Sequence, residues 1–193
     1  MTIFPEHPYL IMSNPNDGIE MRRLAEDHLT IVKVIFGWSL MILVKAGYET
    51  DGATVSLSKA IQIGNSGAEQ VQKLIEHYYP GEDAKSVFDH LVGTPWDLPR
   101  LLAAIVHDAL YSMKWMCRFL CDRVYKWILE ETEYAGIRRD IEYDLIRLLG
   151  WRNWNAVSKE ERKWAQNLVV IKWVRTKKVL KEIERLKNPQ KGK

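Results

Sequence analysis

The hydrophobic residues of this chain follow two different spacings, which divide it into a short first part and a long second part. Residues 29–44 are rich in β-branched and aromatic residues, and Gly37 interrupts the run. This pattern predicts two strands, Leu29–Phe36 and Leu40–Val44. From residue 68 onward, hydrophobic residues recur at intervals of three and four, which is typical of helices that bury one face.

The helical spacing and the end signals predict a mostly helical second part. Gly150 is a candidate helix end, and Ser158 with Glu161 forms a capping box at the start of a long last helix. The predicted helices are 57–63, 68–79, 84–92, 98–113, 115–133, 136–149 and 158–186. We therefore expect an α+β fold, with a mainly helical body and a small N-terminal antiparallel β element. Two parts are expected: a core domain of residues 1–136 and a C-terminal helical extension of residues 137–193, packed on the core or on a partner.

Composition narrows the class of protein only modestly. Hydrophobic residues make up 47% of the 193 positions and the net charge is +3, so no nucleic-acid or lipid partner is required by charge. No apolar run is long enough to span a bilayer, and the N-terminus has no signal-peptide pattern. Cys117 and Cys121, one helical turn apart, are expected to pack in the core rather than to bind zinc with His107.

The most unusual stretch is Leu98–Asp122, where a strongly apolar helix contains His107 and Asp108. Removing an imidazole and a carboxylate from water is costly unless each has a partner. Tyr111 lies on the same helical face as His107, one turn later, whereas Asp108 points elsewhere. The following helix carries Asp122, which an antiparallel arrangement would bring back towards His107.

Two interpretations of this stretch remain open. In the first, His107 is a general base that Asp122 and Tyr111 orient, and Asp108 holds a cation or a backbone donor. In the second, the network is structural, and His107 and Asp108 satisfy loop backbone and Arg118. The Asp51–Gly52 pair nearby is a strong turn signal and is consistent with a plain β-turn.

The segments TDGATVS, AAIVHDALY and CRFLCD, in this order, resemble domain-of-unknown-function family 1353 (DUF1353), which is common in bacteriophages and prophages. The resemblance covers residues 44–128 and implies a phage- or prophage-type viral protein, found in the host cytoplasm or the virion. It brings no established activity. The matched positions are Gly47, Tyr48, Thr50, Asp51, Ala53, Thr54, His107, Asp108, Leu110, Tyr111, Arg118 and Asp122. Thr50 and Arg118 are therefore expected near the site, together with Gly52, which lies between two matched positions.

The spacing H-D-x-x-Y, followed by an aspartate on the next helix, is similar to the site of secreted phospholipases A2. In those enzymes the histidine activates water, the neighbouring aspartate binds calcium, and the tyrosine and distant aspartate orient the histidine. The resemblance implies catalytic roles for His107, Tyr111 and Asp122, and a divalent metal ion such as calcium at Asp108 and Asp51. No other cofactor is expected.

The C-terminal region combines four tryptophans with many basic residues. Such a mixture occurs on single-strand-binding surfaces, but acidic residues dilute it and the spacing fits an amphipathic helix. A protein partner or self-association through this helix is therefore favoured over nucleic acid. For the whole chain we expect a hydrolase-like His–Asp site, metal-assisted or not. The alternative is a virion structural or host-interaction protein without enzymatic activity.

Overall fold

The computed structural model describes residues 10–13, 21–35, 37–50, 65–83, 86–87, 98–132, 134 and 136–187. Within this part, two antiparallel three-stranded sheets accompany a larger helical body. The first sheet has the order β1-β2-β5, and the second has the order β3-β4-β6. The strands are β1 (Leu10–Ser13), β2 (Met21–Leu24), β3 (His28–Ile35), β4 (Trp38–Val44), β5 (Glu49–Thr50) and β6 (Val169–Arg175).

The described helices match most of the helices predicted from residue 65 onward. The α+β class with a helical body is confirmed. The helices are α2 (Asn65–Tyr78), α4 (Leu98–Met113), α5 (Arg118–Glu131), α6 (Gly136–Ala156), α7 (Lys159–Leu168) and α8 (Val179–Lys187), with a short 3-10 turn at Thr176–Lys178.

The hairpin of β3 and β4 confirms the two strands predicted in the first part. The strands pair antiparallel from His28–Val44 to Ile35–Trp38. Gly37 lies between them with φ of 75°, a left-handed conformation that glycine adopts without steric cost. The glycine that interrupts the hydrophobic run is therefore the turn of the hairpin.

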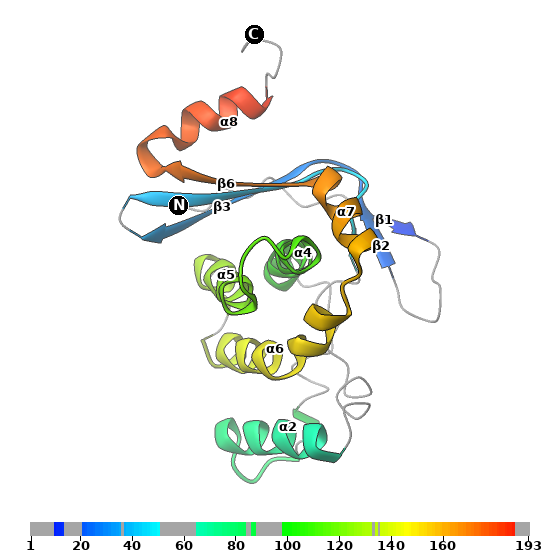
Figure 1. Cartoon of the computed structure of the whole chain (residues 1–193). Helices are drawn as coiled ribbons and strands as arrows, with labels where there is room; N and C mark the ends of the chain where they lie inside the picture. The colour runs from blue at the N-terminus through cyan, green and yellow to red at the C-terminus, as the bar shows by residue number, and fades with distance from the viewer. Residues whose placement is uncertain are drawn as a thin grey trace.

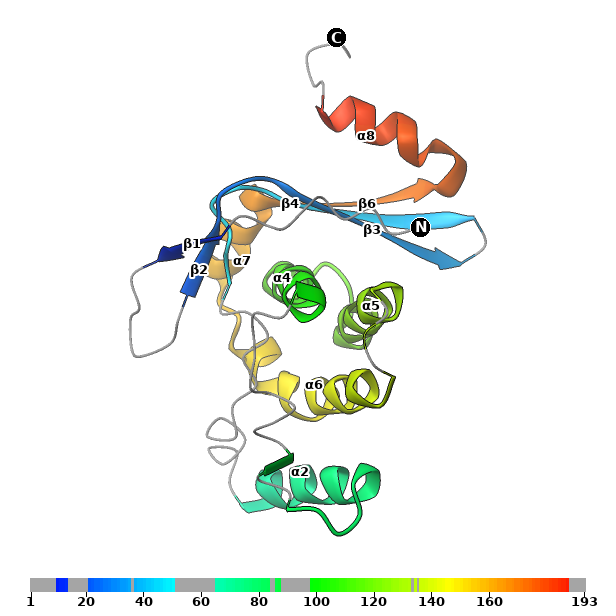
Figure 2. The same ribbon diagram turned by 180° about the vertical axis from the view of Figure 1, so that it is seen from behind.

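The elements stack in successive layers (Figures 1 and 2). The sheet of β3, β4 and β6 lies between α8 on one side and the pair α4 and α5 on the other. Beyond α4 and α5 comes α6, and then α2. Helix α4 is therefore covered on both sides, which explains why its sequence is apolar around almost its whole circumference.

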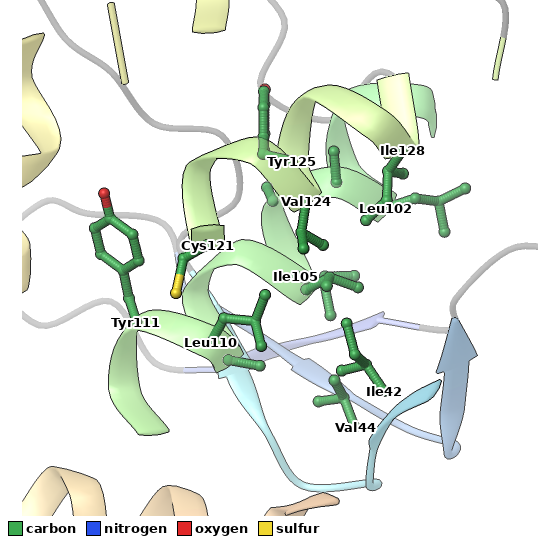
Figure 3. Packing of buried hydrophobic residues seen from close by; sticks show 14 of the residues in the cluster. Ile42, Val44, Leu102, Ile105, Leu110, Tyr111, Cys121, Val124, Tyr125 and Ile128 are labelled. Carbon is green, nitrogen blue, oxygen red and sulfur yellow. The ribbon is translucent and has the colours of Figure 1, made fainter. Parts of the chain in front are cut away.

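The main core lies where α4 and α5 pack on the sheet (Figure 3). Ile42 and Val44 of β4 face Ile105 and Leu110 of α4, and all four are essentially inaccessible to solvent. Burying each such side chain stabilises the fold by about 1.5–3 kcal/mol. Tyr111 lies at the margin of this cluster, with its hydroxyl directed away from the aliphatic side chains (Figure 3). This hydroxyl lies next to Gly150 of α6.

Two predictions for the C-terminal part are wrong. The single helix over 158–186 is instead α7, β6, a 3-10 turn and α8, because the β-branched run Val169–Arg175 pairs with β4 along its length. The expected cap at its start is correct, since Ser158 accepts a hydrogen bond from the backbone of Glu161. Gly150 does not end a helix but lies inside α6.

Some predictions fall outside the described residues. The helix expected at 57–63 lies there entirely, and of the helix expected at 84–92 only Ser86 and Val87 are described, both helical. In the described part of the chain, none of the helices has the length and apolar character needed to cross a membrane.

Candidate functional site

The candidate site is built on the facing sides of α4 and α5. His107 is buried, and its Nε2 lies 3.0 Å from Oδ1 of Asp122, which is fully buried. The expected approach of these two side chains is therefore present. It follows from the antiparallel packing of two consecutive helices joined by a short turn.

Asp122 receives three hydrogen bonds from side chains. Tyr111 donates from its hydroxyl to Oδ1 at 2.5 Å, as the helical spacing from His107 predicted. Arg147 of α6 donates from Nη1 to Oδ2 at 2.6 Å. A buried carboxylate needs such donors, because hydrogen bonds from the protein replace the water it has lost.

The charges of the pair follow from these contacts. Burial raises the pKa of Asp122, but hydrogen bonds from His107, Tyr111 and Arg147 outweigh burial and hold it below the usual range. Burial lowers the pKa of His107, but the carboxylates of Asp108 and Asp122 outweigh it and raise the pKa above 6.5. Asp122 is therefore a carboxylate that only accepts, so Nε2 of His107 carries a proton. In the neutral imidazole the free lone pair is on Nδ1.

Nδ1 of His107 is the ring nitrogen on the side of Asp108. Oδ1 of Asp108 lies 3.9 Å from this atom, beyond hydrogen-bonding distance, and the Asp108 side chain is 30% exposed. The hydroxyl of Thr50 donates to Oδ2 of Asp108 at 2.6 Å, which brings β5 against α4. Thr50 therefore lies beside Asp108.

The other predicted residues have different outcomes. Asp51 and Gly52 lie outside the described residues, so the expected position of Asp51 beside Asp108 stays a prediction. Arg118 begins α5, but it does not bond His107 or Asp108 as the structural interpretation expected. Its Nη2 donates to the backbone carbonyl of Arg147 at 3.0 Å instead.

A metal ion does not fit the side chains that the structure describes. Among them, no group of three or more His, Cys, Asp and Glu side chains is arranged to hold one. Asp108 supplies one carboxylate, whereas calcium takes about six to eight oxygen ligands. Cys121 is buried as expected, and burial raises its pKa to about 12, which disfavours the thiolate that zinc requires. Cys117 is exposed, so its expected burial is wrong.

Sequence reasoning missed two residues of the site, both on α6. One is Arg147. The other is Gly150, where an added Cβ would lie 2.5 Å from the hydroxyl of Tyr111, so α6 approaches this closely only because position 150 has no side chain. A glycine inside an otherwise helical pattern was the available signal, since it often marks a close approach.

Comparisons with known proteins add no relative. No protein-family model matches the chain, and neither the curated proteins nor the solved structures contain a match. The function is therefore argued from the geometry of the site.

Proposed function

We propose that this chain is a phage- or prophage-type hydrolase in which His107 activates a water molecule for attack on an ester or amide. The observation that carries the proposal is the orientation of the imidazole. Asp122 accepts from Nε2, which leaves Nδ1 as the basic nitrogen on the side of the partly exposed Asp108. A base held by a carboxylate on its far nitrogen is the recurring arrangement for activating a nucleophile.

In the proposed reaction, the side chains of the site take up one proton and later return it. Nδ1 takes a proton from water, and the resulting hydroxide attacks the carbonyl carbon of the substrate. The protonated imidazole, stabilised by the negative charge of Asp122, then returns the proton to the leaving alcohol or amine. Tyr111 keeps Asp122 in place by its bond to the same oxygen that holds His107. No step is assigned to a metal ion.

The resemblance to DUF1353 supports the phage or prophage context, and with it the host cytoplasm or virion as the location. Of the matched positions, His107, Tyr111 and Asp122 form one hydrogen-bonded group, and Thr50 bonds Asp108 beside it. Residues far apart in sequence therefore lie close together, which is what a shared site would require. The alternative is a virion or host-interaction protein with a purely structural network, and complete satisfaction of both Asp122 oxygens favours it.

The deciding experiment is a hydrolysis screen with matched variants. Esters, phospholipids and amides are tested with and without calcium, magnesium and zinc, on the parent protein and on His107→Ala, Asp108→Asn and His77→Ala. His77 is an exposed histidine of α2 and serves as the control. Loss of a general base should lower turnover by about two to four orders of magnitude in His107→Ala, and His77→Ala should keep it.

Thermal melts separate the enzyme from the structural alternative. In the enzyme, the parent turns over substrate, and His107→Ala and Asp108→Asn lose turnover while still folding with a cooperative melt. In the structural protein, the parent shows no turnover and both variants melt substantially lower, because buried partners left unpaired cost about 1–3 kcal/mol each.

The partner that best fits the C-terminal helix is a second copy of this chain or another protein. Leu180 on α8 is 71% exposed, although the same helix buries Val179. Replacing Leu180 with Lys should lower self-association measured by sedimentation, and Lys181→Ala on the neighbouring exposed position is the control. If the parent protein already sediments as a monomer and Leu180→Lys has the same molecular mass, this face does not mediate self-association.

A further inference from the structure

Helix α6 contacts the candidate site through Arg147, which lies outside the residues 44–128 that resemble DUF1353. Arg147 donates to Oδ2 of Asp122, on the opposite side of the carboxylate from His107. The guanidinium carbon of Arg147 lies 5.2 Å from the ring centroid of Phe119, and Arg118 bonds the backbone carbonyl of residue 147. Arg147 therefore has contacts at its backbone and at its charged end.

The two carboxylate oxygens of Asp122 have different hydrogen-bond donors. Oδ1 accepts from both His107 and Tyr111, and Oδ2 accepts from Arg147. With no donor at Oδ2, a buried carboxylate gains by rotating or by taking up a proton. Either change weakens the hydrogen bond from Nε2 of His107 to Asp122. The neutral tautomer with its proton on Nε2 is then less strongly favoured.

We propose that Arg147 is a positioning residue for His107. It holds Asp122 as a carboxylate turned so that Oδ1 faces Nε2, and this keeps Nδ1 of His107 as the basic nitrogen. The catalytic consequence rests on the proposed function, whereas the effect on the imidazole does not. Arg147 touches no reacting atom in this scheme, since Asp122 lies between it and His107.

The groups around His107 define what a test must separate. Helix α4 contributes Asp108 and Tyr111, and α5 contributes Asp122 and Tyr125, whose ring lies 5.5 Å from the imidazole. Strand β5 contributes the uncharged Thr50 through Asp108. Arg147 acts on His107 through Asp122, so substituting it changes the imidazole without removing any direct neighbour.

The experiment follows the imidazole nitrogens of His107 by NMR across a pH titration. Arg147→Met removes the guanidinium, Arg147→Lys keeps a charge, and Arg139→Met is the control. Arg139 is on the same helix, and it bonds the neighbouring Asp140. In Arg147→Met the pKa of His107 should fall, because an Asp122 side chain that has rotated or taken up a proton stabilises the imidazolium less. The share of neutral imidazole protonated on Nδ1 should rise, because the hydrogen bond from Nε2 to Asp122 is weaker.

Arg147→Lys should lie between the parent and the Met variant, and Arg139→Met should match the parent. Where a substrate has been found, Arg147→Met should lower kcat about tenfold or more, leave KM within about twofold, and move the rising limb of the pH profile to lower pH together with the pKa of His107. If Arg147→Met fails to fold, the Lys variant carries the same measurements.

The outcomes distinguish this inference from the proposed function. A His107 pKa and tautomer that are the same in both Arg147 variants as in Arg139→Met overturn the positioning role, even if the protein is an active hydrolase. A shift in both variants with no turnover on any substrate supports the positioning role and removes the hydrolase.

Discussion

Among the residues that the structure describes, the buried carboxylates of the helical body are Asp122 and Glu142, and of these two Asp122 alone binds a histidine. Asp122 binds His107, Tyr111 and Arg147. Glu142 of α6 instead binds two tyrosine hydroxyls and an arginine, with distances of 2.9, 2.7 and 2.9 Å to Tyr125, Tyr134 and Arg100. We call these groups the Asp122 network and the Glu142 network.

The networks differ in how their cations meet solvent. The Arg100 side chain is 2% exposed, so the cation of the Glu142 network is buried, whereas the Arg147 side chain is 31% exposed. The Asp122 network also ends in an imidazole whose second nitrogen faces the partly exposed Asp108. A buried carboxylate is therefore not by itself a sign of function. The feature that points to function is a titratable partner, such as an imidazole, whose second nitrogen does not bond the carboxylate.

The largest loss of stability should come from breaking the Glu142 network. Glu142→Gln leaves the guanidinium of Arg100 buried beside a neutral amide, which should cost about 3–5 kcal/mol in free energy of unfolding, measured by denaturant titration. Glu130→Gln, at an exposed position of α5, should change it by less than about 0.5 kcal/mol. Equal effects of the two substitutions would mean that the Glu142 network does not stabilise the fold.

A smaller stability effect with a larger change in the histidine should follow from Asp122→Asn. Arg147 can turn to solvent when it loses its partner, so the loss should be about 1–3 kcal/mol. Burial then acts on His107 with less opposition, and its pKa should fall from above the usual value to below it. NMR titration measures this fall. A His107 pKa that stays raised would show that Asp108 alone controls it, and the contrast between the networks would weaken.

A still smaller effect should come from Gly150→Ala. The new methyl group meets the Tyr111 hydroxyl, and this overpacking should outweigh the helix propensity gained, for a net loss of about 1 kcal/mol. Gly136→Ala on the same helix has its nearest atom at 3.9 Å, the end of a flexible arginine, and should not destabilise. If both variants melt together, α6 does not need its close approach to Tyr111.

The smallest effect should appear in the pH dependence of stability. Because the folded pKa of His107 is raised, its contribution is complete below pH 6.5 and is lost as pH rises through the folded pKa. The difference in free energy of unfolding between the parent and His107→Gln should therefore shrink from pH 6 towards alkaline pH. A difference that grows in this window would mean that His107 is held neutral in the fold.

The sequence was informative where one local pattern decides the structure. Gly37 marked the hairpin turn, and the spacing of His107, Tyr111 and Asp122 sufficed to predict their meeting, because two adjacent antiparallel helices leave few alternatives. Arg147 could not be found this way. Its contact depends on how α6 is rotated against α5, and a surface-like arginine looks the same in sequence whether it meets solvent or a buried carboxylate.

The strand β6 shows a different kind of failure. Its residues, VVIKWVR, include β-branched and aromatic side chains that favour a strand. The capping box at Ser158, although correct, predicts a helix that would continue through them. The choice was settled by the unpaired edge of β4, which lies far away in the sequence. Long-range pairing of this kind overrides a local start signal.

This pairing also sets an order of events during synthesis. Val44 pairs with Val169 and Trp38 with Arg175, so β4 leaves the ribosome long before the strand that covers its edge. Until then the nascent chain exposes a row of free backbone donors and acceptors next to Leu40 and Ile42. Such an edge recruits other chains. The edge of β4 is thus covered only after residues 169–175 have been translated, and a chain released before residue 169 would keep this edge exposed to other chains.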